Sequence, residues 1–181
     1  MPAIIIQPAS GGLPAGTETM NILLMMLRSV RPSRISDMPA IAKPRWIRRG
    51  YEGMTFFGHI ITHTKQEAEA FSRLGPLKNH EMIHLYQARS THNSWFCFYL
   101  KYFAFWLHIT VRLAWPFRSK RHPRRHVPNA GYRLNPFEME AYEHMHNLHY
   151  LDDKPDGATG WRRYAQMTLD ERIDLQDVAD M

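Results

Sequence analysis

The sequence predicts an α+β fold that is mostly helical, with a short strand or hairpin ahead of its principal helix. The segment Met54–Thr64 is rich in aromatic and β-branched residues, which favour strands, and Gly58 suits a bulge within it. From Gln66 the pattern becomes helical. Gly75-Pro76 separates two helical segments, and proline suits the first turn of the second.

The 181 residues are enough for one ordinary domain with a flexible end. Residues 1–50 contain frequent Pro, Gly and Ser, and we expect an irregular N-terminal arm that packs on the domain or belongs to a partner. Residues 51–151 form the expected core. Residues 152–181 are predicted to form a turn and a C-terminal helix, which Thr168 and Glu171 open as a capping box.

The net charge of +6 raises nucleic acid or anionic lipid as a partner. Most Lys and Arg residues are dispersed and no stacking aromatic motif accompanies them, so we expect no specific nucleic-acid partner. The single cysteine, Cys97, cannot form an internal disulfide and lies among aromatic residues, as a core side chain would. The first residues lack the features of a secretory signal, which predicts a cytoplasmic protein.

The segment Ser94–Phe117 is the most aromatic part of the chain. Lys101, His108 and Arg112 lie along one face of the predicted helix and would be costly inside a bilayer, so we do not expect it to span a membrane. We expect an amphipathic helix that buries its aromatic side chains in the core. The alternative is a helix that lies in a membrane interface and gives peripheral membrane contact.

The residues that carry chemistry are His80, Glu81 and His84, in the order HExxH. On a helix, positions i and i+4 lie one turn apart on one face, so both imidazoles can reach one ion. Zinc binds neutral imidazole nitrogen readily, and a carboxylate beside the ion can take a proton from a water molecule. In a chain with 11 His and 9 Glu, this pattern arises by accident about 3% of the time.

HEMIHLYQ followed by NPFEMEAY resembles the gluzincin-type zinc metallopeptidases, and the order of elements resembles small predicted metallopeptidases. The resemblance covers residues 53–150 and implies a zincin-like core holding one Zn²⁺ per chain. It implies His80, His84 and Glu138 as ligands and Glu81 as the catalytic base. In the family an aspartate that orients a histidine ligand commonly follows; here Tyr142 takes its place.

Glu138 and Glu140 are about 200° apart on a helix, so they cannot both face the ion. Glu138 matches the family's ligand position. It also lies three residues after Asn135, where a capping role is open to it, and Glu140 would then be the ligand. We favour Glu138.

Other polar residues offer alternatives. A second cluster comprises His144, His146 and His149, which we interpret as a solvated helix face. His59 and His63 lie on the predicted strand, where they either line a cleft or belong to the strand surface; we favour the strand surface. The candidate donors to a reaction oxyanion are Tyr86, Tyr142 and His126, and the sequence alone does not choose between them.

The pattern therefore indicates an enzyme, a zinc metalloendopeptidase-like hydrolase acting on a peptide or protein substrate. Two alternatives stay open: a non-catalytic zinc-binding scaffold, and a basic adaptor that binds a membrane interface through residues 94–117.

Overall fold

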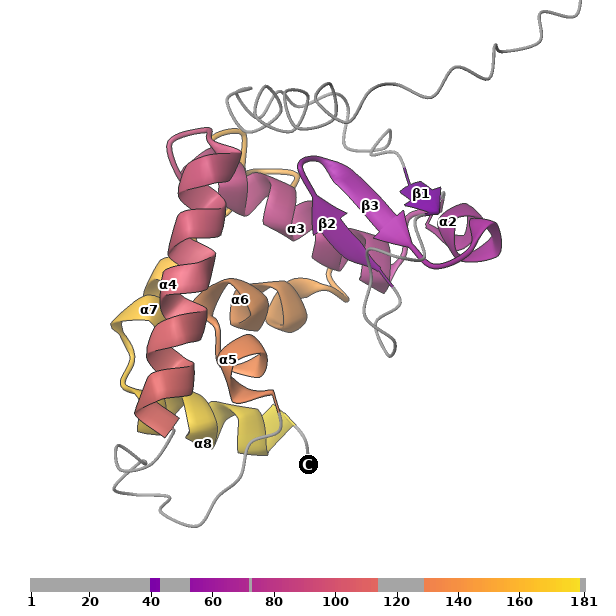
Figure 1. Ribbon diagram of the computed structural model, residues 1–181. Helices are drawn as coiled ribbons and strands as arrows, with labels where there is room; N and C mark the ends of the chain where they lie inside the picture. The colour runs from indigo at the N-terminus through magenta and orange to yellow at the C-terminus, as the bar shows by residue number, and fades with distance from the viewer. Residues whose placement is uncertain (1–39, 43–52, 72, 114–128, 180–181) are drawn as a thin grey trace, which may run out of the picture.

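A computed structural model describes residues 40–42, 53–71, 73–113 and 129–179 of the chain (Figure 1). The fold is mostly helical with one small sheet, as the sequence predicts. The helices are α2 Lys65–Ala70, α3 Pro76–Ser90, α4 Trp95–Leu113, α5 Ala130–Arg133, α6 Pro136–His144, α7 Trp161–Gln166 and α8 Leu169–Ala179.

The sheet has three strands, in the order β1-β3-β2: β1 is Ala40–Ala42, β2 Met54–Phe56 and β3 His59–Thr62. β2 and β3 form the predicted hairpin, and β1 runs parallel to β3. Both residues between β2 and β3 have positive φ, 47° at Phe57 and 82° at Gly58, as a tight type I′ turn requires. Gly58 is therefore a turn residue and not the expected bulge.

The ends of the chain differ in part from the expectation. β1 lies inside the region expected to be an irregular arm, while the remainder of residues 1–50 lies outside the described residues. Near the C-terminus, the predicted capping box opens α8: Glu171 N–H donates to the Thr168 hydroxyl at 3.3 Å, and Thr168 N–H to the Glu171 carboxylate at 2.7 Å. A further short helix, α7, precedes it.

α6 ends at His144. The side-chain amide of Asn79, on α3, lies 3.0–3.1 Å from the carbonyl oxygens of His144, Met145 and Asn147. These carbonyls therefore have a partner outside the helix, as the last carbonyls of a helix require. The contact also fixes the end of α6 against α3.

α3 is the central element of the domain, because every residue from Lys78 to Ala88 is buried. The hairpin, α4 and α6 surround it (Figure 1). The core between these elements is aromatic. Phe137 is fully buried, and its ring centroid lies 4.9 Å from that of Phe98 and 4.7 Å from that of Trp161.

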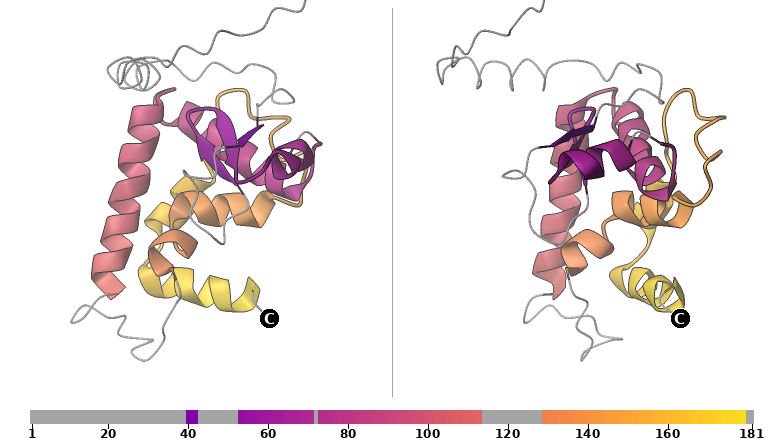
Figure 2. Two further views of the ribbon diagram at one scale, coloured as in Figure 1. Left: turned by 45° about the vertical axis from the view of Figure 1, so that its right-hand side comes forward. Right: turned by 90° about the vertical axis from the view of Figure 1, so that its right-hand side faces the viewer.

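α4 runs along one margin of the molecule, with the other described elements on one side of it in the left view of Figure 2. It buries Trp95, Phe98 and Ile109. Several other large apolar side chains of α4 are exposed, so the prediction that it buries its aromatic residues holds only for one face. Within the described part of the chain, no helix is both long and apolar enough to cross a bilayer.

The complete burial of Phe137 predicts that its ring contributes strongly to the stability of the fold. Phe137→Ala should lower the free energy of unfolding by about 3–5 kcal/mol, because the change removes a buried ring and leaves a cavity. Urea denaturation measures this. Phe96→Ala removes the same atoms from an exposed position on α4 and should change stability by less than about 1 kcal/mol. Equal losses from both variants would contradict the core assignment.

Candidate metal centre

His80 and His84 lie one helical turn apart on α3, and both are buried. Their Nε2 atoms are 3.2 Å apart. Two imidazoles this close in a buried helix are unfavourable unless a proton, a hydrogen-bond partner or a metal ion satisfies their nitrogens. The spacing of the motif thus produces the pair of converging nitrogens that the sequence predicts.

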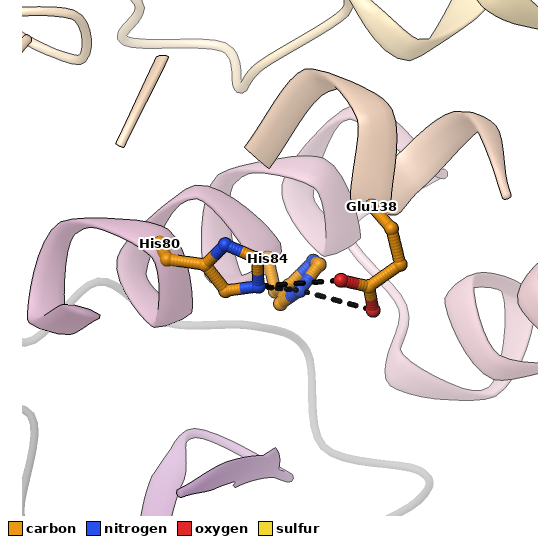
Figure 3. A group of neighbouring side chains, drawn as sticks. All are labelled: His80, His84 and Glu138. Carbon is orange, nitrogen blue, oxygen red and sulfur yellow. Dashed lines mark hydrogen bonds and ion pairs between the residues drawn. The ribbon is translucent and has the colours of Figure 1, made fainter. Parts of the chain in front are cut away.

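Glu138 extends from α6 toward this pair (Figure 3). Its Oε2 lies 3.2 Å from His80 Nε2, and its Oε1 lies 3.5 Å from His84 Nε2. Ligand atoms arranged tetrahedrally around an ion at about 2.0–2.1 Å are separated by about 3.3–3.4 Å, close to the separations seen here. These three buried residues can hold a metal ion, and they are the one such group of His, Cys, Asp or Glu among the described residues.

Glu140 lies on another side of α6 and has a different environment. Its carboxylate is fully buried and accepts four hydrogen bonds of 2.7–3.0 Å. The donors are the Gln87 amide, the Tyr150 hydroxyl and the N–H groups of Gly160 and Trp161 at the start of α7. A Cβ at Gly160 would come within 2.6 Å of this carboxylate, which explains the glycine. Glu140 thus anchors α7.

The capping role considered for Glu138 is filled differently. The Asn135 side chain accepts from the N–H of Phe137 at 3.2 Å, while the Glu138 carboxylate faces the histidines. Glu138 also accepts a hydrogen bond of 2.7 Å from the Tyr102 hydroxyl of α4. Two elements therefore position this carboxylate: α6 carries it and α4 holds one of its oxygens.

Gln87 fixes the orientation of His84. The Gln87 amide nitrogen donates to the Phe137 carbonyl and to the Glu140 carboxylate, both at 2.8 Å, and neither of these groups can donate in return. The Gln87 oxygen must then face His84 Nδ1, 2.7 Å away, and accept its proton. This leaves His84 Nε2 as the nitrogen available to a metal.

Sequence reasoning missed Gln87, although a signal exists. Gln87 lies three residues after His84 and seven after His80, on the helix face that carries both histidines. In the gluzincin-type metallopeptidases that the sequence resembles, an aspartate orients a histidine ligand. Here the ring of Tyr142 packs on His80 at 4.6 Å between centroids, and His80 Nδ1 has no hydrogen-bond partner among the described residues. Orientation by hydrogen bonding is thus observed for His84 and orientation by packing for His80.

Charges within the group reinforce one another. Burial by itself lowers the pKa of His84, but the Glu138 carboxylate outweighs this effect and raises that pKa to about 9. Burial also opposes ionisation of Glu138, and His84 together with hydrogen bonds from both histidines holds the Glu138 pKa well below its usual range. Without a metal, protonated His84 and ionised Glu138 therefore form a buried ion pair. A metal ion that binds to His84 would take the place of its proton.

Glu81 lies beside the three residues at the edge of an open cleft. The Thr55 hydroxyl of β2 contacts the Glu81 carboxylate and lies 3.2 Å from the backbone carbonyl oxygen of Glu81. Tyr99 of α4 in turn holds the hairpin, because its hydroxyl donates to the Thr55 carbonyl at 3.1 Å. The strand before the motif thus supports Glu81, as well as forming one wall of the cleft.

The cleft has a volume of about 530 Å³, and its acidic and histidine lining residues are His80, Glu81, His84 and Glu138. Most of the remaining lining is aromatic: Phe56, Phe98, Tyr99, Tyr102, Trp106 and Tyr132.

The tyrosines at the cleft differ from those expected. Tyr86 is buried in the core and Tyr142 contacts His80 without lining the cleft, while His126 lies outside the described residues. Tyr102 and Tyr132 line it instead. Burial raises the pKa of Tyr132 well above its usual range, and the nearby Glu138 charge adds to this, so its hydroxyl keeps its proton and can donate a hydrogen bond.

The other histidines in the described part of the chain do not join the site. His144 stacks on Tyr150 at 3.8 Å between centroids, and His149 pairs with Asp152 at the surface. His59 bonds to the Phe57 carbonyl, and neither it nor His63 lines the cleft. Cys97 is half-buried, and the structure gives it no place at the site either.

No protein-family model matches this chain, and no curated protein or solved structure matches it. Function is therefore inferred from the side chains of the site itself.

The raised pKa of His84 predicts that metal binding releases a proton. At about pH 7 the metal-free His84 is protonated, so Zn²⁺ should displace about one proton on binding. Below pH 9 the apparent affinity should therefore fall roughly tenfold per unit as pH falls. Isothermal titration calorimetry in buffers of different ionisation enthalpy measures the proton count. An affinity that is constant between about pH 6 and pH 8 would contradict the assignment.

Proposed function

We propose that this chain is a zinc-dependent metallopeptidase that hydrolyses peptide bonds with Glu81 as its base. One observation carries the proposal: the buried group His80, His84 and Glu138 lies in an open cleft beside Glu81. A purely structural metal site is usually closed by four protein ligands, whereas three ligands beside a cleft leave a position for water or substrate.

The ligand types favour zinc. Imidazole suits zinc, copper, iron and nickel, whereas magnesium and calcium prefer oxygen ligands. Two histidines and one glutamate form a ligand set that is characteristic of catalytic zinc. The separations of 3.2–3.5 Å between ligand atoms support a small ion with four-coordinate geometry.

A zinc ion held by these residues would polarise a substrate carbonyl and lower the pKa of a water molecule. Glu81 would take the proton of the attacking water and deliver it to the leaving amine. Thr55 supports this role, because its contact with the Glu81 carboxylate fixes the side chain at the cleft. Tyr132 keeps its proton and lines the same cleft, so it is placed to donate a hydrogen bond to the oxygen that gains charge.

The shape of the cleft fits part of a peptide. Its volume of about 530 Å³ falls in the range of small-molecule pockets and can enclose one or two side chains. The aromatic lining, including Phe98, Tyr99 and Trp106, favours apolar side chains.

Metal loading gives the first test. The purified protein should carry about one zinc per chain, and His80→Ala/His84→Ala should abolish loading, because two of three ligands are lost. His146→Ala/His149→Ala makes the same chemical change in the other histidine cluster and should retain the zinc. Elemental analysis measures both. Full zinc in the first variant and loss in the second would place the ion at residues 144–149.

A second pair of variants separates the two carboxylates of α6. Glu138→Gln should lower zinc content, since it removes the charged ligand. Glu140→Gln places an amide among four donors, so it should lower stability in urea while zinc content falls much less. The opposite pattern of zinc loss would assign the ligand to Glu140.

The role of Glu81 predicts a separation of chemistry from binding. Glu81→Gln keeps the shape of the side chain but removes the base, so it should retain zinc and stability while peptide hydrolysis falls on the order of 10²-fold or more. Cleavage of a mixed peptide library followed by mass spectrometry measures activity. Glu69→Gln, at an exposed position of α2, is the matched control and should be as active as the unmodified protein.

Hydrolysis that survives Glu81→Gln would not come from this site. Zinc-loaded protein with no activity on the library would favour the non-catalytic zinc scaffold.

A further inference from the structure

α4 presents a continuous apolar face to the outside of the molecule. The exposed fractions of five large side chains lie between 45% and 58%, at Phe96, Leu100, Phe103, Leu107 and Val111. Their spacing of four, three, four and four residues places them on one side of the helix. We call this set the outer stripe; it is about 22 Å long at 1.5 Å per residue.

The fold does not need the outer stripe for its own core. Trp95, Phe98 and Ile109 are the buried residues of α4. Phe98 and Ile109 lie on the side of the helix opposite the stripe, and Trp95 lies roughly 120° from it. Single exposed apolar residues are common, but a continuous apolar strip along a whole helix marks a surface that contacts something else.

The charged side chains of α4 have one sign. α4 contains no Asp or Glu, and its basic side chains Lys101, His108 and Arg112 fall in a row roughly 120° around the helix axis from the stripe. His108 and Arg112 are exposed, and the whole chain carries a net charge of +6. An apolar and aromatic face together with a separate row of basic residues is typical of a helix that lies in the interface of an anionic membrane.

We propose that the outer stripe docks on an anionic lipid membrane, with α4 lying parallel to its surface. Phe and Leu side chains would enter the boundary between headgroups and acyl chains, while the exposed Arg112 reaches acidic headgroups. Lys101 contributes to the positive charge of the molecule but not to this contact, because its ammonium lies 5.3 Å from the ring centroid of Trp161. A second copy of the chain is a poorer occupant, because the same helix offers no acidic residue to pair with these cations. The proposal concerns the surface of α4 and does not depend on the metal centre or on catalysis.

The outer stripe adjoins the cleft. Phe103 of the stripe stacks on Trp106, with ring centroids 5.6 Å apart and an interplanar angle of 23°, and Trp106 lines the cleft. Trp106 is 38% exposed, as suits a tryptophan at the level of lipid headgroups. Docking through the stripe would bring the cleft close to the membrane surface.

Vesicle sedimentation with the full chain tests the proposal. The probes are vesicles of phosphatidylcholine alone and vesicles with about 30% phosphatidylserine, in about 0.15 M salt. The protein should sediment with the anionic vesicles and much less with the neutral ones. Leu100→Gln/Leu107→Gln removes apolar area without changing net charge and should weaken binding at least roughly tenfold.

The matched control is Leu77→Gln/Leu175→Gln, which makes the same change at two exposed leucines on α3 and α8 and should bind like the unmodified protein. Circular dichroism checks that both variants are folded. The proposal is overturned if the unmodified protein stays in the supernatant with anionic vesicles. It is also overturned if Leu100→Gln/Leu107→Gln binds undiminished, since the attraction would then come from basic residues elsewhere, or if both variants weaken binding equally.

Discussion

The interface between α3 and α6 carries buried charge, and the rest of the site depends on how that charge is compensated. A buried carboxylate without a compensating partner is costly, and α6 brings two buried carboxylates, Glu138 and Glu140, to α3. Glu140 is satisfied by four hydrogen-bond donors, whereas Glu138 faces two imidazoles. Gln87 joins the two environments, because its amide nitrogen serves Glu140 and its oxygen receives His84. The two carboxylates, two residues apart, thus have different environments: Glu140 completes the fold, and Glu138 belongs to a group that can hold a metal ion.

α4 connects the two halves of the cleft. Through Tyr99 it holds the strand that supports Glu81, and through Tyr102 it holds the carboxylate of Glu138. Contacts with α4 therefore help to position both the proposed base on α3 and the proposed ligand on α6. The inner side of that helix is committed to this task, which leaves its outer side free of any role in the core. One helix thereby gives both the wall of the cleft and a separate apolar surface.

Local patterns predicted the parts of this structure that depend on local physics. The hairpin, the position of Pro76 at the start of α3, and the capping box of α8 follow from near neighbours in the chain. The convergence of His80 and His84 follows from helical periodicity. The roles of Tyr102 and Tyr132 did not follow, since they arise from contacts between elements distant in sequence. The exposure of one side of α4 was equally unreadable, because aromatic residues surround that helix on most sides and only packing decides which of them are covered.

The position of the three residues along the chain has a consequence for folding. His80 and His84 lie in α3 and Glu138 in α6, so a bound ion would tie together segments that are separated by the whole of α4. Closing so long a loop costs conformational entropy before any contact rewards it, and such non-local pairings slow folding. An ion at this position would cross-link α3 and α6 in the native state. It would restrict the unfolded chain only if it stayed bound after unfolding. Since the unfolded chain has no such preformed cage, the ion would instead favour the native topology and slow its unravelling.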